Sequence, residues 1–245
     1  GRFDIEINTD TNSISSYQWS SVPITNDTCP KDLALEEVLK HYKAATDKKY
    51  SRMVTRFKRQ LTHPSRYQET ELGDLFADIL QESLRLDIML VGSGSIRTTE
   101  LGPIVLLSDF TECFPYDDVV HMLNVSGAQL RRMIHYMLRD EVWEGSHCEF
   151  YQLSQGLHVV YDKQSRQFKE FTLNDEPISD NRIYRIGLQH YHFANLVASF
   201  GVQLSEVEEN GETRVIATSC REILEEYLSS HQNLDRQVCG RLIIE

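Results

Sequence analysis

The sequence predicts an α+β protein in which a mixed β-sheet packs against helices. Three observations favour this class. Residues 53–92 read as strand, helix and buried strand in succession. Residues 156–173 read as a hairpin, and further helical segments follow strands at irregular intervals. Parallel and antiparallel pairings are therefore both expected in one sheet.

The first 50 residues differ from the rest of the chain. Residues 2–24 alternate apolar and polar side chains around the turn-rich NTDTNS, which predicts a strand pair too small to bury a core. Leu35, Val38, Leu39 and Tyr42 then recur at helical spacing. We expect a short amphipathic helix that connects two folded parts.

The main body begins near residue 53 with a strand, MVTRFKRQL. A helix capped by Thr70 is predicted for the segment ETELGDLFADILQESLRL. Gly73 lies in its first turn, where a glycine is costly unless something packs close to the backbone. A buried strand is predicted for DIMLVG, and a further strand is predicted for RIYRIGLQ. The segment VVHMLNVS predicts a strand that leads into a helix capped by Ser126. TSCREILEEYLSSH predicts a helix with a Ser219/Glu222 capping box.

Composition excludes some classes of function. The 245 residues are 40% hydrophobic and 25% charged, as in ordinary globular proteins. No apolar run approaches the roughly 20 residues of a membrane span. The net charge of −12 argues against broad nucleic-acid binding. One basic stretch, residues 47–60, is expected to be a solvated strand face or a contact for acidic neighbours.

A loop rich in small residues follows an apolar run at residues 90–102, LVGSGSIRTTELG. It has no lysine for a P-loop, no third glycine for a dinucleotide fingerprint, and Val91 where a nucleophile elbow needs glycine. Backbone amides with Arg97 can hold an anion or a carbonyl group. The alternative is a tight turn with a surface arginine.

The sequence offers no convincing metal site. His190-Tyr-His192 is expected to place two imidazoles on one side of a strand, but no cysteine or carboxylate lies nearby in sequence to complete a set. The five cysteines are scattered, so they predict no disulfide framework and leave the redox compartment open. We expect no metal and no cofactor in this chain.

Five segments in order resemble one family: RYQETELGDLFADIL, DIMLVGSGSIRTTELGPI, LSDFTECFPYDDVVHMLNVSGAQLRRMI, QLSQGLHVVYD and IYRIGLQHYHFAN. They resemble the C-terminal, substrate-binding domain of 5'-nucleotidases, whose pattern includes E-T-x-x-G-N-L, N-G-G-G-I-R and L-P-F. The match covers about residues 60–200. Each piece is weak alone, and the ordered set carries the resemblance.

The resemblance implies a domain organisation. In that family an N-terminal metallophosphoesterase domain with two divalent metals performs hydrolysis, and its motifs are not found in this chain. Residues 1–30 then resemble the closing strands of that missing domain, residues 31–52 a linker with a hinge helix, and residues 53–245 the substrate-binding domain. The implied partners are a nucleotide or nucleoside and the protein's own catalytic domain. A location outside the cytoplasm is favoured by resemblance only, and a cytoplasmic one stays open.

The resemblance also implies site residues. Arg66 and Arg97 match substrate-contacting arginines, and Tyr116 matches one aromatic jaw around the base, where tyrosine can also stack. Phe200 is the expected second jaw, and Glu206 stands where the family often has aspartate. Gly92 replaces the asparagine of N-G-G-G-I-R, which removes a side-chain hydrogen bond to the base, and the family's N-G-G run before the second aromatic is missing.

Two functions remain open from the sequence. The first is the nucleotide-binding domain of a metallophosphoesterase that hydrolyses nucleotide phosphate esters, which the arginines and Tyr116 favour. The alternative is a non-catalytic domain of the same fold, used for structure or partner contact, which Gly92 favours.

Overall fold

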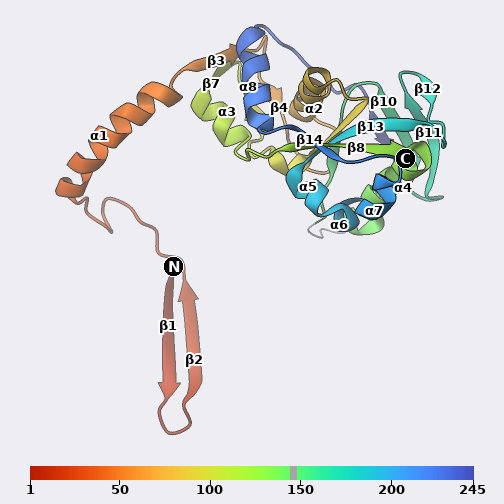
Figure 1. Cartoon of the computed structure of the whole chain (residues 1–245). Helices are drawn as coiled ribbons and strands as arrows, with labels where there is room; N and C mark the ends of the chain where they lie inside the picture. Colours follow the sequence, from red (N-terminus) through yellow and green to blue (C-terminus); the bar gives the residue numbers. More distant parts are fainter. Residues whose placement is uncertain (144–147) are drawn as a thin grey trace. The chain divides into compact units, whose positions relative to one another are not determined.

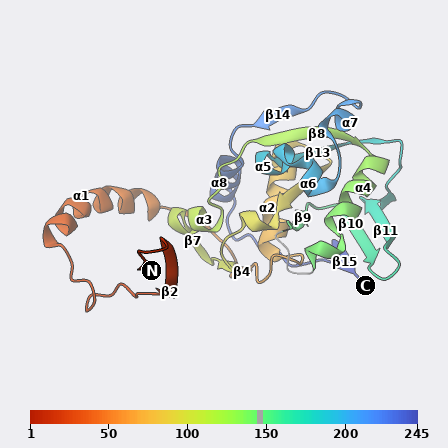
Figure 2. The same ribbon diagram turned by 90° about the horizontal axis from the view of Figure 1, so that it is seen from below.

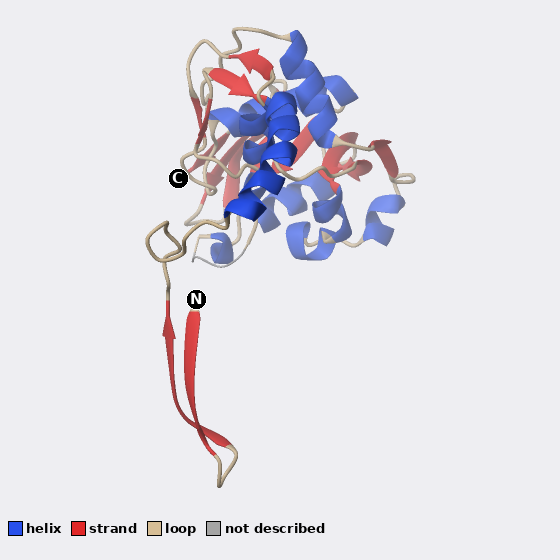
Figure 3. Ribbon diagram, turned by 90° about the vertical axis from the view of Figure 1, so that its left-hand side faces the viewer, coloured by secondary structure: helices blue, strands red, loops and turns tan. Residues whose placement is uncertain are grey.

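The computed structural model describes residues 1–143 and 148–245, and its contacts divide the chain into two compact units, Gly1–Lys49 and Tyr50–Glu245. The first unit holds an antiparallel hairpin of β1 (Arg2–Asn8) and β2 (Ser13–Ser20), drawn as a two-stranded ribbon in Figure 3. Helix α1 (Leu33–Tyr50) follows and buries none of its residues. It is longer than the stretch of periodic apolar residues. Its role as a hinge stays a prediction.

The second unit is built on a five-stranded sheet in the order β14-β8-β13-β5-β9 (Figure 1). The strands are β5 (Ile88–Gly92), β8 (Val120–Ser126), β9 (Tyr151–Leu153), β13 (Ile183–Gln189) and β14 (Arg214–Ala217). β13 pairs parallel with β5 and antiparallel with β8. The expected α+β class with a mixed sheet is therefore confirmed.

Both faces of strand β5 are buried, which explains why its sequence is a continuous apolar run. Ile88 and Leu90 point into one hydrophobic cluster, whereas Met89 and Val91 point into another. Successive side chains of a strand alternate between the two faces, so a strand covered on both faces must be apolar throughout. The carboxyl end of β5 is thereby fixed in the middle of the unit.

Helices cover both faces of this sheet. The first cluster includes α4 (Gly127–Met137) and α6 (Leu196–Phe200), and the second includes α2 (Glu71–Leu84), α3 (Leu107–Cys113) and α8 (Cys220–Ser230) (Figure 2). The hydroxyls of the expected capping residues Thr70, Ser126 and Ser219 accept hydrogen bonds from backbone amides of α2, α4 and α8. Of the expected Ser219/Glu222 capping box, the structure shows the bond to the Ser219 hydroxyl and not the reciprocal one. Short helices α5 (His190–Ala194) and α7 (Leu204–Glu208) flank α6.

A second sheet has the order β12-β11-β10-β15. The predicted hairpin is confirmed as β10 (Leu157–Asp162) with β11 (Gln167–Leu173). β12 (Glu176–Pro177) extends one edge, and β15 (Leu242–Ile244) pairs parallel with β10 at the other. The last residues described are thus part of the fold.

Two local expectations are wrong. MVTRFKRQL is not one strand: β3 (Met53–Arg56) pairs with β7 (Ile104–Leu106), and β4 (Leu61–Thr62) pairs with β6 (Glu100–Leu101). Between them the amide of Lys58 donates to the carbonyl of Leu234, which interrupts the ladder. His190 and His192 lie in α5 and not on a strand, because β13 ends at Gln189.

The basic stretch, residues 47–60, contacts acidic neighbours, which is one of the two expectations for it. Arg52 pairs with Glu225, and Arg59 pairs with Glu71 and Asp235. Among the described residues, no helix is both long and apolar enough to cross a membrane.

Candidate functional site

The carboxyl end of β5 opens into a cavity of about 740 Å³ within the second unit. The loop after β5, a 3-10 turn at Ser93–Ser95, forms one wall. The start of α5 forms another, and the segment after α3 completes it. The cavity is lined by Arg66, Gly94, Ser95, Arg97, Tyr116, Asp117, Asp118, Glu149, Gln189, His190, Tyr191, His192, Ala194 and Asn195.

Three of the residues expected from the sequence meet in this cavity. Arg66, Arg97 and Tyr116 all line it. Arg97 is exposed, and its Nη1 lies 3.4 Å from the carbonyl oxygen of Gly94. Its backbone amide donates to the carbonyl of Cys113 at 2.8 Å, which fixes the loop against α3. Most of the donors of Arg97 therefore remain available to a ligand.

Two tyrosines give the cavity exposed aromatic surface. Tyr116 is 51% exposed and Tyr191 is 65% exposed. A carboxylate oxygen of Asp118 accepts a hydrogen bond from the backbone amide of Tyr191 at 2.9 Å, which fixes the start of α5. Sequence reasoning missed Tyr191. The HYH tripeptide was the available signal, but its histidines suggested only metal ligation.

Phe200 is not part of the cavity, so its assignment as the second aromatic jaw is wrong for this structure. It is 0% exposed at the end of α6, and its ring centroid lies 4.5 Å from that of Tyr151. Its hydrophobic surface is used in the core of the unit. A base cannot stack on a ring with no accessible face.

Glu206 also lies outside the cavity. It is on α7, where it accepts hydrogen bonds from the guanidinium of Arg132 of α4. Arg132 and Gln129 hold the pKa of Glu206 below its usual range, with the hydrogen bond from Arg132 as the largest cause. The expected role of Glu206 in binding is therefore replaced by a contact between two helices.

Gly92 is buried behind the cavity wall and does not line it. A Cβ atom at this position would lie 2.1 Å from Nε2 of His192, so the imidazole fills the space that a side chain at residue 92 needs. Nδ1 of His192 lies 2.9 Å from the hydroxyl oxygen of Tyr151. Burial lowers the pKa of His192 to about 4. A neutral imidazole therefore lines the cavity where the family pattern has asparagine.

Glu149 is a second residue that the sequence did not reveal. Oε1 accepts a hydrogen bond from the amide of Gly94 at 2.6 Å, and Oε2 accepts one from Nη2 of Arg66 at 3.2 Å. Burial raises the pKa of Glu149, and the donors at Gly94 and Arg66 oppose that shift. No periodicity or motif marks this residue, which lies before β9 and far from the loop in sequence.

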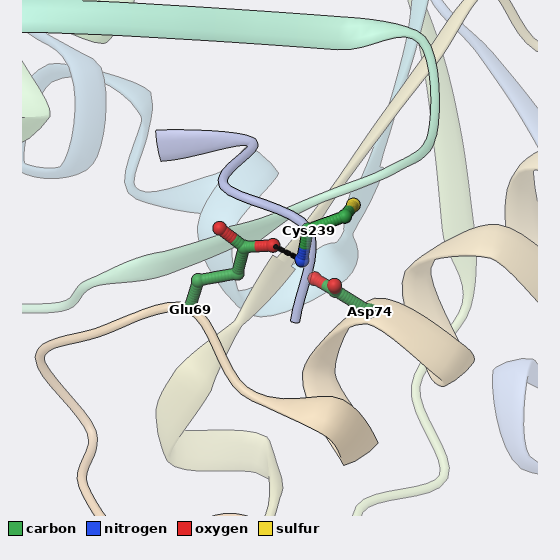
Figure 4. Close-up of side chains that lie close together, drawn as sticks. All are labelled: Glu69, Asp74 and Cys239. Atoms are coloured by element: carbon green, nitrogen blue, oxygen red, sulfur yellow. Dashed lines mark hydrogen bonds between the residues drawn. The ribbon is translucent and has the colours of Figure 1, made fainter. Parts of the chain in front are cut away.

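A cluster of Glu69, Asp74 and Cys239 lies elsewhere in the unit (Figure 4). Their candidate ligand atoms are within 4.8 Å of one another. Arg241 lies among them, with Nε 3.4 Å from an oxygen of Asp74 and 3.5 Å from the sulfur of Cys239. The guanidinium already supplies positive charge and an N–H there, so we assign this cluster to the fold and not to a metal.

Comparisons with known proteins agree with this architecture. The sequence profile of the family "5'-nucleotidase, C-terminal domain" matches residues 44–197. A 5'-nucleotidase of Vibrio parahaemolyticus is 22% identical over 170 residues, which are 69% of this chain and 28% of that protein. The chain belongs to the 5'-nucleotidase C-terminal domain family.

Solved structures share the fold. A 5'-nucleotidase precursor of Thermus thermophilus has a TM-score of 0.72 at 17% identity, with 99% of this chain and 49% of that chain covered. A putative 5'-nucleotidase of Staphylococcus aureus gives 0.70 at 13%, covering 98% and 49%. The NAD nucleotidase of Haemophilus influenzae gives 0.67 at 13%, covering 98% and 48%. The chain thus spans about half the length of these proteins and less of the Vibrio relative.

Proposed function

We propose that the cavity binds the nucleoside part of a nucleotide, and that the chain serves as the substrate-binding domain of a nucleotide-hydrolysing 5'-nucleotidase. Two exposed tyrosines and the available guanidinium of Arg97 around one cavity carry this proposal. Aromatic faces stack on any base, and a guanidinium donates to base, sugar or phosphate oxygens. The two divalent metals for hydrolysis would belong to a separate catalytic domain.

The tyrosines form the pair of aromatic jaws in this proposal. Tyr191 takes the place that the resemblance assigns to Phe200, and Tyr116 keeps its assignment. Each lies at the end of a secondary-structure element, Tyr116 after α3 and Tyr191 in the first turn of α5. Backbone contacts hold both elements, so the rings can stack at little cost in conformational entropy.

The organisation of the cavity favours binding over a purely structural role. Asp117 accepts a hydrogen bond from the hydroxyl of Ser219 and pairs with Arg221, and Asp118 fixes Tyr191. The cavity walls are therefore organised by hydrogen bonds, while the tyrosine rings stay exposed. A domain used only as a spacer has no need for exposed aromatic rings beside a polar cavity.

Titration of the ¹⁵N-labelled chain with adenosine and uridine tests this function. We expect weak binding, with Kd of about 0.1–10 mM, because two stacking faces offset only part of the entropy lost on binding. Amide shifts should centre on Tyr116, Tyr191 and the Gly92–Arg97 loop. Tyr191→Ala should weaken binding by about 1–3 kcal/mol.

Phe200→Leu is the matched control, because it changes a ring in the core and not one on the cavity. It should lower stability and leave the Kd of the folded chain nearly unchanged. No shifts at millimolar nucleoside, or shifts confined to another surface, would contradict the proposed function.

A further inference from the structure

The donors of the loop after β5 are already occupied by an anion that belongs to the chain. The amide of Gly94 donates to Oε1 of Glu149, and Arg66 donates to Oε2. A Cβ at residue 94 would lie 2.0 Å from Nη2 of Arg66 and 2.8 Å from Oε2 of Glu149. A side chain at residue 94 would therefore move the carboxylate or the guanidinium away from this backbone.

This arrangement gives the two arginines different surroundings. Arg66 forms an ion pair with Glu149, whereas Arg97 forms no ion pair with any residue that the structure describes. A phosphate at Gly94 and Arg66 would have to displace the carboxylate and would be repelled by it. Arg97 is thus the guanidinium that remains for an acceptor group of a ligand.

Glu149 still has acceptor capacity for a ligand. A carboxylate has about four lone-pair directions on its two oxygens, and the chain uses two of them here. The side chain is 20% exposed and lines the cavity. What it can accept from a ligand is a hydroxyl or amino hydrogen, and what it rejects is a second anion.

We propose that Glu149 is a specificity-determining residue that closes the Gly94–Arg66 corner of the cavity to phosphate and presents an acceptor for hydroxyl groups there. The proposal rests on the proposed function for its ligand, a ribonucleotide. The sugar hydroxyls then face Glu149 and the phosphate points away from this corner. A nucleotide with the opposite orientation is excluded by charge.

Inorganic phosphate is the direct probe, added to the ¹⁵N-labelled 245-residue chain and followed at the Gly94 amide. We expect no saturable shift in the wild-type chain. Glu149→Ala frees both donors and removes the repelling charge, so phosphate should bind there with affinity raised roughly tenfold or more, as hydrogen bonds to charged groups allow. Glu149→Gln should show a smaller increase.

Glu206→Gln is the matched control. It removes the same charge from another carboxylate paired with an arginine, but outside the cavity. It should leave phosphate binding at Gly94 as in the wild type. If Glu149→Ala fails to fold, Glu149→Gln carries the test, because loss of the charge alone must raise phosphate affinity.

A second arm compares adenosine with 2',3'-dideoxyadenosine. The wild-type chain should prefer adenosine, and Glu149→Ala should lose most of that preference. Unchanged phosphate affinity in both Glu149 variants, with nucleosides still bound, would overturn this inference and leave the proposed function intact. Absence of nucleoside binding together with a gain of phosphate binding would refute the proposed function and retain the exclusion of anions by Glu149.

Discussion

At the scale of the residue, the surroundings of Asp74 strongly disfavour its charge. Its side chain is fully buried, and neither carboxylate oxygen accepts a hydrogen bond from a described residue. Burial raises the pKa of Asp74 from 3.8 to about 8; Arg241 opposes the shift and Glu69 adds to it. We therefore expect the carboxyl group to be protonated at neutral pH.

This shift predicts how stability depends on pH. The folded state binds the Asp74 proton more tightly than the unfolded state, so the contribution to stability is complete below about pH 4 and is lost as pH rises to about 8. The loss is at most about 1.4 kcal/mol per pH unit. Asp74→Asn keeps a neutral side chain of the same shape at every pH.

Urea unfolding of the wild type and Asp74→Asn at about pH 5, 6.5 and 8 measures the effect across the interval between the two pKa values. The stability of Asp74→Asn relative to the wild type should increase with pH. His63 and His192, whose pKa values burial lowers to about 4, lose stability on the acid side in both proteins, so their contributions cancel. Asp180→Asn, at an exposed carboxylate, is the control and should show no such trend. A constant difference between the two proteins would contradict the assignment.

At the scale of the element, the start of α2 depends on a glycine. A Cβ at Gly73 would lie 2.2 Å from Oε1 of Gln152. That amide binds three residues in two segments: Oε1 accepts from the backbone of Thr70, and Nε2 donates to the carbonyl of Gln68 and the hydroxyl of Ser93. The close approach that would justify a glycine in the first helical turn is present.

Gly73→Ala should therefore destabilise the chain by about 1–3 kcal/mol, although alanine is the better helix former. Chemical denaturation measures the change. Combining Gly73→Ala with Gln152→Ala should recover part of the loss, because the shorter side chain at residue 152 no longer clashes with the new Cβ at residue 73. Additive losses in the double variant would show that the bridge at Gln152 is not what requires glycine.

At the scale of the whole molecule, the chain by itself should not hydrolyse nucleotides. The proposed function assigns hydrolysis to a separate catalytic domain, where two metal ions would activate water and stabilise the displaced oxygens. Among described residues, the cluster of Glu69, Asp74 and Cys239 has ligand-like spacing, but Arg241 lies against it and it does not line the tyrosine-containing cavity. The relatives that share the fold are about twice as long as this chain.

Release of phosphate from AMP by the purified chain, with Mn²⁺ or Zn²⁺ added, tests this directly. We expect no release above a protein-free blank, and no stoichiometric transition metal by elemental analysis of the purified chain. Turnover that disappears in Arg97→Ala would contradict the prediction, because the activity would then belong to this cavity.

The framework of this protein could be predicted from its sequence. Apolar periodicity located α2, α4 and α8, the capping residues marked where they begin, and the uninterrupted apolar run of β5 marked a buried strand. Burial patterns and caps depend on neighbours in sequence, which is why they can be read from one chain. Arg66, Arg97 and Tyr116 line the cavity, and they could be selected from the sequence because ordered motifs preserve their places along the chain.

Which side chains meet in the cavity depends on the tertiary structure. Phe200 and Tyr191 are both aromatic residues that follow β13, and packing against Tyr151 holds one in the core while the short helix α5 leaves the other exposed. Glu149 reaches Gly94 across 55 residues of sequence. Such pairs depend on the three-dimensional positions of distant segments, to which no local periodicity or cap is sensitive, and so the fold settles the chemistry of the cavity.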